Sequence, residues 1–139
     1  MAEEIKKTIL IAEDEEDLLE MYSMALSSKG FEVLKAINGI QALEWLEKKY
    51  DQIDLILLDI VMPGMDGFET LEKIKKDDRF KKIPVVVSTN LDNSEDKAQA
   101  MDLGARDYFV KSQHTPSELV AEAETIISYN DNLASKKIV

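Results

Sequence analysis

Short, nearly uninterrupted apolar runs alternate along the chain with longer segments in which apolar residues recur every three or four positions. The short runs are rich in β-branched residues, which favours strands. Because most of them lack the polar alternation of a half-exposed strand, they are typical of a parallel sheet covered by helices on both faces. The predicted strands span residues 9–12, 31–36, 55–58, 85–87 and 108–110.

The segments between the strands predict five amphipathic helices. Gly30 can end the first in the left-handed conformation. The fifth begins most clearly, because Thr115 can act as N-cap and Glu118 can complete a capping box around Pro116. The fourth helix is predicted over residues 94–103. The expected apolar faces comprise Leu18, Tyr22, Ala25 and Leu26 in the first helix, Ala42, Leu43, Trp45 and Leu46 in the second, Phe68, Leu71 and Ile74 in the third, and Leu119, Ala123, Ile126 and Ile127 in the fifth.

Five strand–helix units predict an α/β protein with a doubly wound parallel sheet, since a closed barrel of this kind needs about eight. The connections between parallel strands are expected to be right-handed. In open α/β sheets, ligands bind outside the carboxyl ends of the strands. Candidate functional residues are therefore those that directly follow each strand.

Composition narrows the class of protein. The chain has 139 residues, 17 basic and 28 acidic side chains, a formal net charge of -11 and no cysteine. This length suits one domain. The charge argues against direct binding to nucleic acid or to an anionic membrane, and the apolar runs fall far short of a membrane helix of roughly 20 residues. We expect a soluble, cytoplasmic domain without disulfides or thiolate metal sites.

The acidic excess lies almost entirely in residues 1–70 and includes five consecutive acids at positions 13–17. Acids at a helix start can simply favour the helix dipole. However, Asp59 also directly follows the third strand, which neighbours the first in a doubly wound sheet. Glu13, Asp14 and Asp59 are therefore expected to converge, and such close like charges favour a bound cation. Mg2+ suits a site of a few carboxylates and water.

Two other strand ends add complementary chemistry. Thr89 ends the fourth strand with a hydroxyl group, and Lys111 follows the fifth with a cation on a long side chain. Either residue alone is usually structural or solvated. Together with the three carboxylates they form a set suited to phosphoryl transfer, which depends mainly on positioning and charge neutralisation.

Four segments in this order resemble the receiver domain of two-component response regulators, with chemotaxis-regulator-like spacing. The resemblance covers residues 7–128 and implies a flavodoxin-like sheet in the order 2-1-3-4-5. Residues 1–6 are then an N-terminal extension, and residues 129–139 are a C-terminal tail or a truncated linker. The segments are residues 9–14, 59–67, 84–89 and 104–111.

By this resemblance Asp59 is the phospho-acceptor, receiving a phosphoryl group from a sensor histidine kinase or a histidine phosphotransfer protein. Asp14 and Asp59 would bind Mg2+ directly, with Mn2+ as a substitute. Glu13 stands where the family often has Asp and would act through water. The backbone carbonyl of Val61 would be a further ligand.

The resemblance also implies a switch. Lys111 would pair with the phosphoryl oxygens, Thr89 would close on them, and Tyr108 would turn inward as Thr89 moves. The surface of the fourth helix, fifth strand and fifth helix would then signal to an unknown output protein or a C-terminal effector domain. The chain would be a monomer or a phosphorylation-dependent dimer, and a signalling domain rather than a turnover enzyme.

Several positions depart from the family pattern. Ser112 replaces the proline that usually follows Lys111, which leaves open whether that peptide bond is cis, because non-proline cis bonds cost about 2.5–4 kcal/mol. Asn90 replaces a small residue and can narrow access to the phosphoryl group. Val61 and Leu91 place apolar side chains where water would approach. We therefore predict slow autodephosphorylation.

Three alternatives remain at this point. A receiver-like module could bind partners without phosphorylation, although Asp59, Asp14, Thr89 and Lys111 are all present. An aspartyl-phosphate hydrolase normally has a second Asp two residues after the nucleophile, where this chain has Val61. A flavin-binding electron carrier needs a phosphate loop after the first strand, where the acids would repel phosphate.

Overall fold

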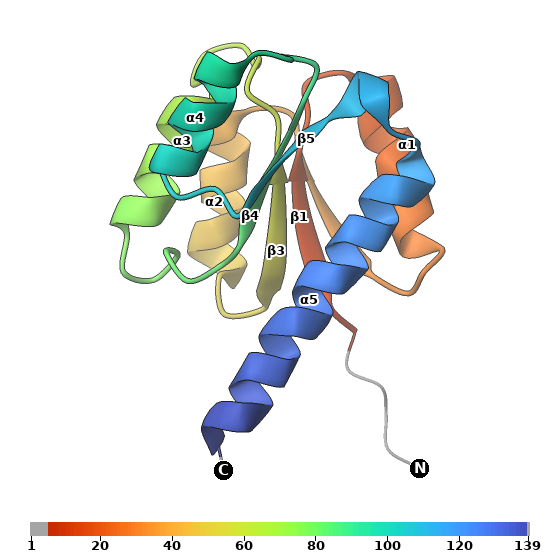
Figure 1. Cartoon of the computed structure of the whole chain (residues 1–139), viewed down its shortest axis with the longest axis vertical. Helices are drawn as coiled ribbons and strands as arrows, with labels where there is room; N and C mark the ends of the chain where they lie inside the picture. Colours follow the sequence, from red (N-terminus) through yellow and green to blue (C-terminus); the bar gives the residue numbers. More distant parts are fainter. Residues whose placement is uncertain (1–5, 139) are drawn as a thin grey trace.

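The structure is a computed structural model that describes the backbone of residues 6–138 and the side chains of residues 6–133. A five-stranded parallel sheet in the order β2-β1-β3-β4-β5 lies between two layers of helices (Figure 1), so the predicted fold class and strand order are confirmed. The elements are β1 (Thr8–Ala12), α1 (Glu16–Ser27), β2 (Glu32–Ala36), α2 (Gly39–Lys49), β3 (Ile53–Leu58), α3 (Gly67–Lys76), β4 (Val85–Thr89), α4 (Ser94–Asp102), β5 (Asp107–Val110), a short 3-10 turn (Lys111–Gln113) and α5 (Pro116–Ile138).

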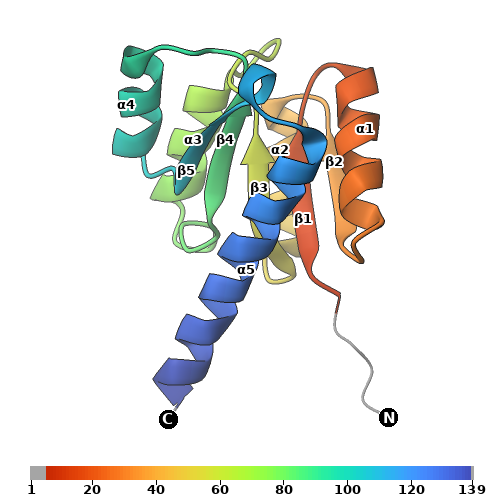
Figure 2. The same cartoon turned by 45° about the vertical axis from the view of Figure 1, so that its right-hand side comes forward.

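Both faces of the sheet are covered. Helices α2, α3 and α4 pack on one face, and α1 and α5 pack on the other (Figures 1 and 2). All five residues of β1 and of β4 are buried, which explains why these strands lack polar alternation. Among the described residues, no helix combines the length and the apolar character needed to cross a membrane.

The buried face of α1 differs slightly from the expected one. Leu19 is buried at 5% exposure together with Tyr22 and Leu26. Leu18 and Ala25, which were expected on this face, are only partly buried against the same cluster. The face is thus rotated by about one position, because periodicity alone does not fix which of two adjacent leucines points at the sheet.

Helix α5 begins as predicted and continues further than expected. The Thr115 hydroxyl accepts the Glu118 backbone N–H at 3.2 Å, and Glu118 Oε1 accepts the Thr115 N–H at 3.1 Å, which completes the capping box. The helix then runs to Ile138, past the predicted boundary at residue 128 (Figure 2). Residues 117–138 contain no glycine or proline to stop it. The end of the receiver domain remains a prediction, and residues 1–5 of the predicted extension lie outside the described part.

The C-terminal part of α5 contacts side chains next to the sheet. Lys7 Nζ donates to Asp131 Oδ1 at 3.0 Å, and the Arg106 guanidinium lies 4.8 Å from the centre of the Tyr129 ring. Both contacts join α5 to residues beside β1 and β5. The segment predicted as a tail, residues 129–139, therefore begins as part of α5 and contacts the rest of the domain.

The strand register places the candidate residues side by side. Ala12 of β1 pairs with Leu58 of β3, and the Asp59 N–H donates to the Ala12 carbonyl at 3.0 Å. Glu13 and Asp59 therefore leave the sheet next to each other at its carboxyl edge.

Candidate functional site: an acidic pocket at the carboxyl edge of the sheet

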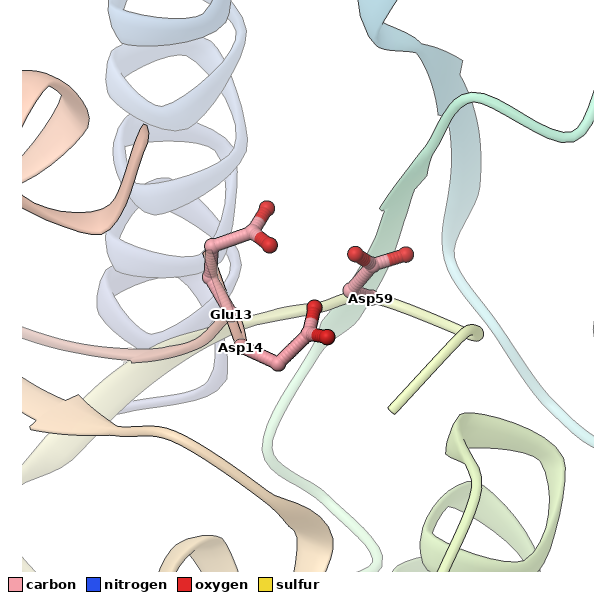
Figure 3. Close-up of side chains that lie close together, drawn as sticks. All are labelled: Glu13, Asp14 and Asp59. Atoms are coloured by element: carbon pink, nitrogen blue, oxygen red, sulfur yellow. The ribbon is translucent and has the colours of Figure 1, made fainter. Parts of the chain in front are cut away.

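Three carboxylates converge where β1 and β3 end (Figure 3). Glu13, Asp14 and Asp59 each offer one oxygen, and these oxygens lie within 4.8 Å of one another. Glu13 and Asp59 are 2% and 6% exposed, whereas Asp14 is half-buried. The convergence predicted from the strand ends is confirmed.

The Asp59 carboxylate is held at both oxygens. Its Oδ1 accepts the backbone N–H of Ile60 at 2.7 Å and of Val61 at 3.3 Å. Its Oδ2 accepts from Lys111 Nζ at 3.0 Å. These contacts fix the direction of the buried carboxylate and offset the cost of keeping its charge away from water. The two backbone donors carry no residue-type information, so the sequence could not reveal them.

Lys111 supplies the counter-charge. It is 8% exposed, and its Nζ also donates to Glu13 Oε1. Burial by itself would lower the pKa of Lys111, but the Asp59 and Glu13 carboxylates outweigh that effect and raise the pKa above its ordinary value. Burial raises the pKa of the Glu13 carboxyl, and the Lys111 ammonium only partly offsets this shift.

The pocket opens beside these groups and has a volume of about 260 Å³. Its floor is acidic, and its rim includes the apolar side chains of Val61 and Leu91, which were predicted to restrict water. Val61 is 58% exposed. The lining residues are Glu13, Asp14, Glu15, Leu18, Asp59, Val61, Thr89, Asn90, Leu91 and Lys111.

Thr89 and Tyr108 both bind the backbone of Leu91 in the β4–α4 loop. Thr89 is 1% exposed, and its Oγ1 accepts the Leu91 N–H at 3.4 Å. The Tyr108 hydroxyl donates to the Leu91 carbonyl at 2.7 Å. Tyr108 is already buried, at 9% exposure. Burial also raises the pKa of Tyr108, which keeps its hydroxyl protonated and able to donate.

The β3–α3 loop brings the start of α3 close to the phospho-acceptor candidate. Gly67 N–H donates to the Ile60 carbonyl at 2.8 Å, and a Cβ at Gly67 would lie 2.2 Å from the Asp59 carbonyl oxygen. Only glycine allows this approach. The Asp66–Gly67 pair is the sequence feature that marks it, because Asp66 caps α3 by accepting the Glu69 N–H at 2.9 Å.

The peptide after Lys111 is trans, since no peptide bond in the described part of the chain is cis. Ser112 lies in the 3-10 turn Lys111–Gln113. Replacement of the expected proline therefore leaves Lys111 inside the pocket.

The donor set fits a hard divalent cation. Three carboxylates supply oxygen ligands, which Mg2+ prefers, and Asp14, the most exposed of the three, is open to water. The Lys111 ammonium already lies against two of them, which shows that the pocket accommodates positive charge.

Comparison with known families agrees with this geometry. The family model described as the response regulator receiver domain matches residues 9–124. This chain belongs to the response regulator receiver family. The receiver is a signalling domain. The resemblance to this family that the four sequence segments indicated is therefore confirmed.

Curated relatives are longer than this chain. The Pseudomonas aeruginosa phosphate regulon transcriptional regulatory protein PhoB is 37% identical over 123 residues, which are 88% of this chain and 52% of that protein. Response regulator PleD of Caulobacter vibrioides is 39% identical over 103 residues, which are 74% of this chain and 22% of PleD. The chain thus spans about half or less of the length of these two relatives.

Solved structures match nearly end to end. A CheY-like receiver domain protein from Methanospirillum hungatei has a TM-score of 0.84 at 26% identity, covering 92% of this chain and 98% of that one. The chemotaxis protein CheY4 of Vibrio cholerae has a TM-score of 0.81 at 27% identity, covering 88% and 99%. The receiver fold therefore accounts for nearly the whole described chain.

Proposed function

We propose that Asp59 accepts a phosphoryl group from a phosphohistidine on a sensor histidine kinase or a histidine phosphotransfer protein in the cytoplasm. The observation that carries this proposal is the buried Asp59 carboxylate, fixed by two backbone N–H groups and by Lys111 Nζ at 3.0 Å beside two further carboxylates. A carboxylate oxygen attacks phosphorus and forms an O–P bond. The P–N bond breaks, and its electron pair returns to the imidazole nitrogen.

The surrounding side chains have separate roles in this proposal. Asp14 and Asp59, with Glu13 through water and the Val61 backbone carbonyl, would hold Mg2+ or Mn2+. The metal, when bound, would neutralise charge on the phosphoryl oxygens. Lys111 lies within reach of the same oxygens and adds a fixed positive charge.

Thr89 and Tyr108 would transmit the change. A phosphoryl group adds about 1.5–2 negative charges and three acceptor oxygens. If the Thr89 side chain rotates to bring its hydroxyl to one of them, its oxygen moves away from the Leu91 N–H, while Tyr108 still donates to the Leu91 carbonyl. Loss of the Thr89 hydrogen bond would favour a rearrangement of the β4–α4 loop.

Helix α4 is suited to such a rearrangement. Only Ala100 among its nine residues is buried, so few apolar contacts resist its displacement. The surface of α4, β5 and α5 would change its packing equilibrium and signal to an output protein or a C-terminal effector region. Direct nucleic-acid contact is not part of the proposal for this domain, whose net charge is -11.

Autodephosphorylation is expected to be slow, because Val61 and Leu91 offer no polar group to position water at the pocket rim. A phosphorylated lifetime of only seconds, with Mg2+ and without a phosphatase, would contradict this expectation.

The direct test is incubation with a small phosphoramidate donor and Mg2+, followed by mass spectrometry. We expect one acid-stable, base-labile phosphate, and none in Asp59→Asn. Asp51→Asn is the matched control, because Asp51 is an exposed carboxylate just before β3 at the other end of that strand. Absence of label, or equal labelling of Asp59→Asn, would overturn the proposal.

A further inference from the structure

The Lys111 ammonium is shared between two of the three pocket carboxylates. It donates to Glu13 Oε1 and to Asp59 Oδ2, the latter at 3.0 Å. All three side chains are more than nine-tenths buried. In this low-dielectric setting, charge pairs interact more strongly than at the surface.

Glu13 is oriented for this contact. Its backbone N–H donates to the Ala36 carbonyl at 2.9 Å, which fixes the main chain at the end of β1. Its second carboxylate oxygen, Oε2, accepts the Glu15 N–H at 3.1 Å. One oxygen of Glu13 is therefore held by the backbone, and the other faces Lys111.

The same carboxylates form the cation pocket. Glu13 and Asp59 belong to the group whose oxygens lie within 4.8 Å of one another. A divalent cation among these oxygens would meet a positive charge already in contact with two of the three carboxylates. Either the ammonium moves away or the two cations repel each other at close range.

We propose that Lys111 is a resident counter-cation of the acidic pocket, held there by Glu13, and that it competes with divalent cations until a phosphoryl group draws it away. Glu13 is then a positioning residue that acts through Lys111, in addition to any role as a ligand. The final step of this proposal rests on the proposed function, but the competition itself does not.

A double-mutant cycle on the unphosphorylated chain tests the competition, with the Mg2+ Kd measured by calorimetry. We expect Lys111→Met to tighten Mg2+ binding by about 10-fold or more, since it removes the opposing charge. Glu13→Gln removes a favourable charge but also frees Lys111, so we expect a change of less than about 3-fold. In the Lys111→Met background, the same Glu13→Gln change should weaken binding by about 10-fold.

Two further variants separate this effect from net charge and from misfolding. Lys35→Met removes a positive charge from the exposed Lys35–Glu20 pair and should leave the Kd within about 2-fold. Lys111→Arg keeps the charge and should tighten binding less than Lys111→Met does. If circular dichroism shows that Lys111→Met is unfolded, Glu13→Asp is measured instead. Its shorter side chain keeps the negative charge but should no longer reach Lys111, so Mg2+ should bind more tightly.

The proposal is overturned if Lys111→Met leaves the Kd within about 2-fold, or if Glu13→Gln has the same effect in both backgrounds. If Asp59 is not phosphorylated but the Lys111 and Glu13 substitutions show the expected coupling in the Mg2+ Kd, the proposed function is rejected and the competition stands. If Asp59 is phosphorylated but the two substitutions change the Kd independently, the competition is rejected and the proposed function stands.

Discussion

The Tyr108 hydroxyl donates a 2.7 Å hydrogen bond to the Leu91 carbonyl and so links β5 to the β4–α4 loop. The Leu91 N–H of the same residue is bound to Thr89 Oγ1. Both polar backbone groups of Leu91 are thus used by residues of the proposed switch. A change at Thr89 can reach α4 through one residue, without any movement of the sheet.

Replacement of Tyr108 by phenylalanine should loosen this loop. The buried ring is retained, so the main loss is one hydrogen bond, and the free energy of unfolding should fall by about 1 kcal/mol. Urea unfolding measures this loss, and amide exchange at residues 91–93 should speed up. Tyr129→Phe is the control, because Tyr129 is 49% exposed. An equal effect in both variants would contradict the assigned role.

Gly67→Ala should cost more than Gly39→Ala. The new Cβ at Gly67 would meet backbone, 2.2 Å from the Asp59 carbonyl oxygen. At Gly39 the nearest atom is the Thr70 side-chain oxygen at 2.1 Å, and the nearest backbone atom, the Met65 carbonyl oxygen, is 3.0 Å away. We expect Gly67→Ala to destabilise by about 1–3 kcal/mol or more and to reduce labelling of Asp59. Chemical unfolding gives the ranking, and a larger loss in Gly39→Ala would refute it.

Glu122 should make stability fall as pH rises from 4.5 to about 7. Its carboxyl lies beside Asp107, and the hydrogen bond to Asp107, with burial, raises the pKa of Glu122 from 4.5 to about 7. The folded state therefore binds the proton more tightly than the unfolded state. This contribution is complete below pH 4.5 and is lost as pH rises to about 7.

Glu122→Gln should flatten this part of the stability profile, measured by urea unfolding at several values between pH 5 and pH 8. Glu124→Gln, at an exposed position of the same helix, should keep the wild-type slope. Parallel profiles for the wild type and Glu122→Gln would show that the shared proton does not stabilise the fold.

Val61→Asn should shorten the lifetime of the phosphorylated chain. Val61 lies at the pocket rim and is 58% exposed, so a polar side chain there can orient an attacking water. We expect a rate increase of about 10-fold, below the range of a fully positioned general base. Loss of label over time measures it, with Ile40→Asn, 53% exposed and outside the pocket lining, as control. An unchanged rate would argue against restriction of water by Val61.

Much of the fold follows from local patterns. Uninterrupted β-branched runs predicted buried parallel strands, and the residues Thr115 to Glu118 predicted the start of α5, because these signals depend on neighbouring residues only. Asp59, Glu13 and Lys111 were found because each follows a strand, and parallel strands end at one edge. The length of α5 was missed, since polar residues after Ile127 resemble a tail unless their contacts with Lys7 and Arg106 are known.

The contacts that set the chemistry required the folded chain. Lys111 and Glu13 are 98 residues apart, and nothing in either segment specifies that they pair. The same holds for the bond from Tyr108 to a backbone carbonyl and for the approach of Gly67 to Asp59. Residue types and their order therefore identify the family and the acidic pocket. Which groups touch within that pocket depends on where the sheet places the ends of β1, β3 and β5 relative to one another, because hydrogen bonds and ion pairs act over only a few ångströms.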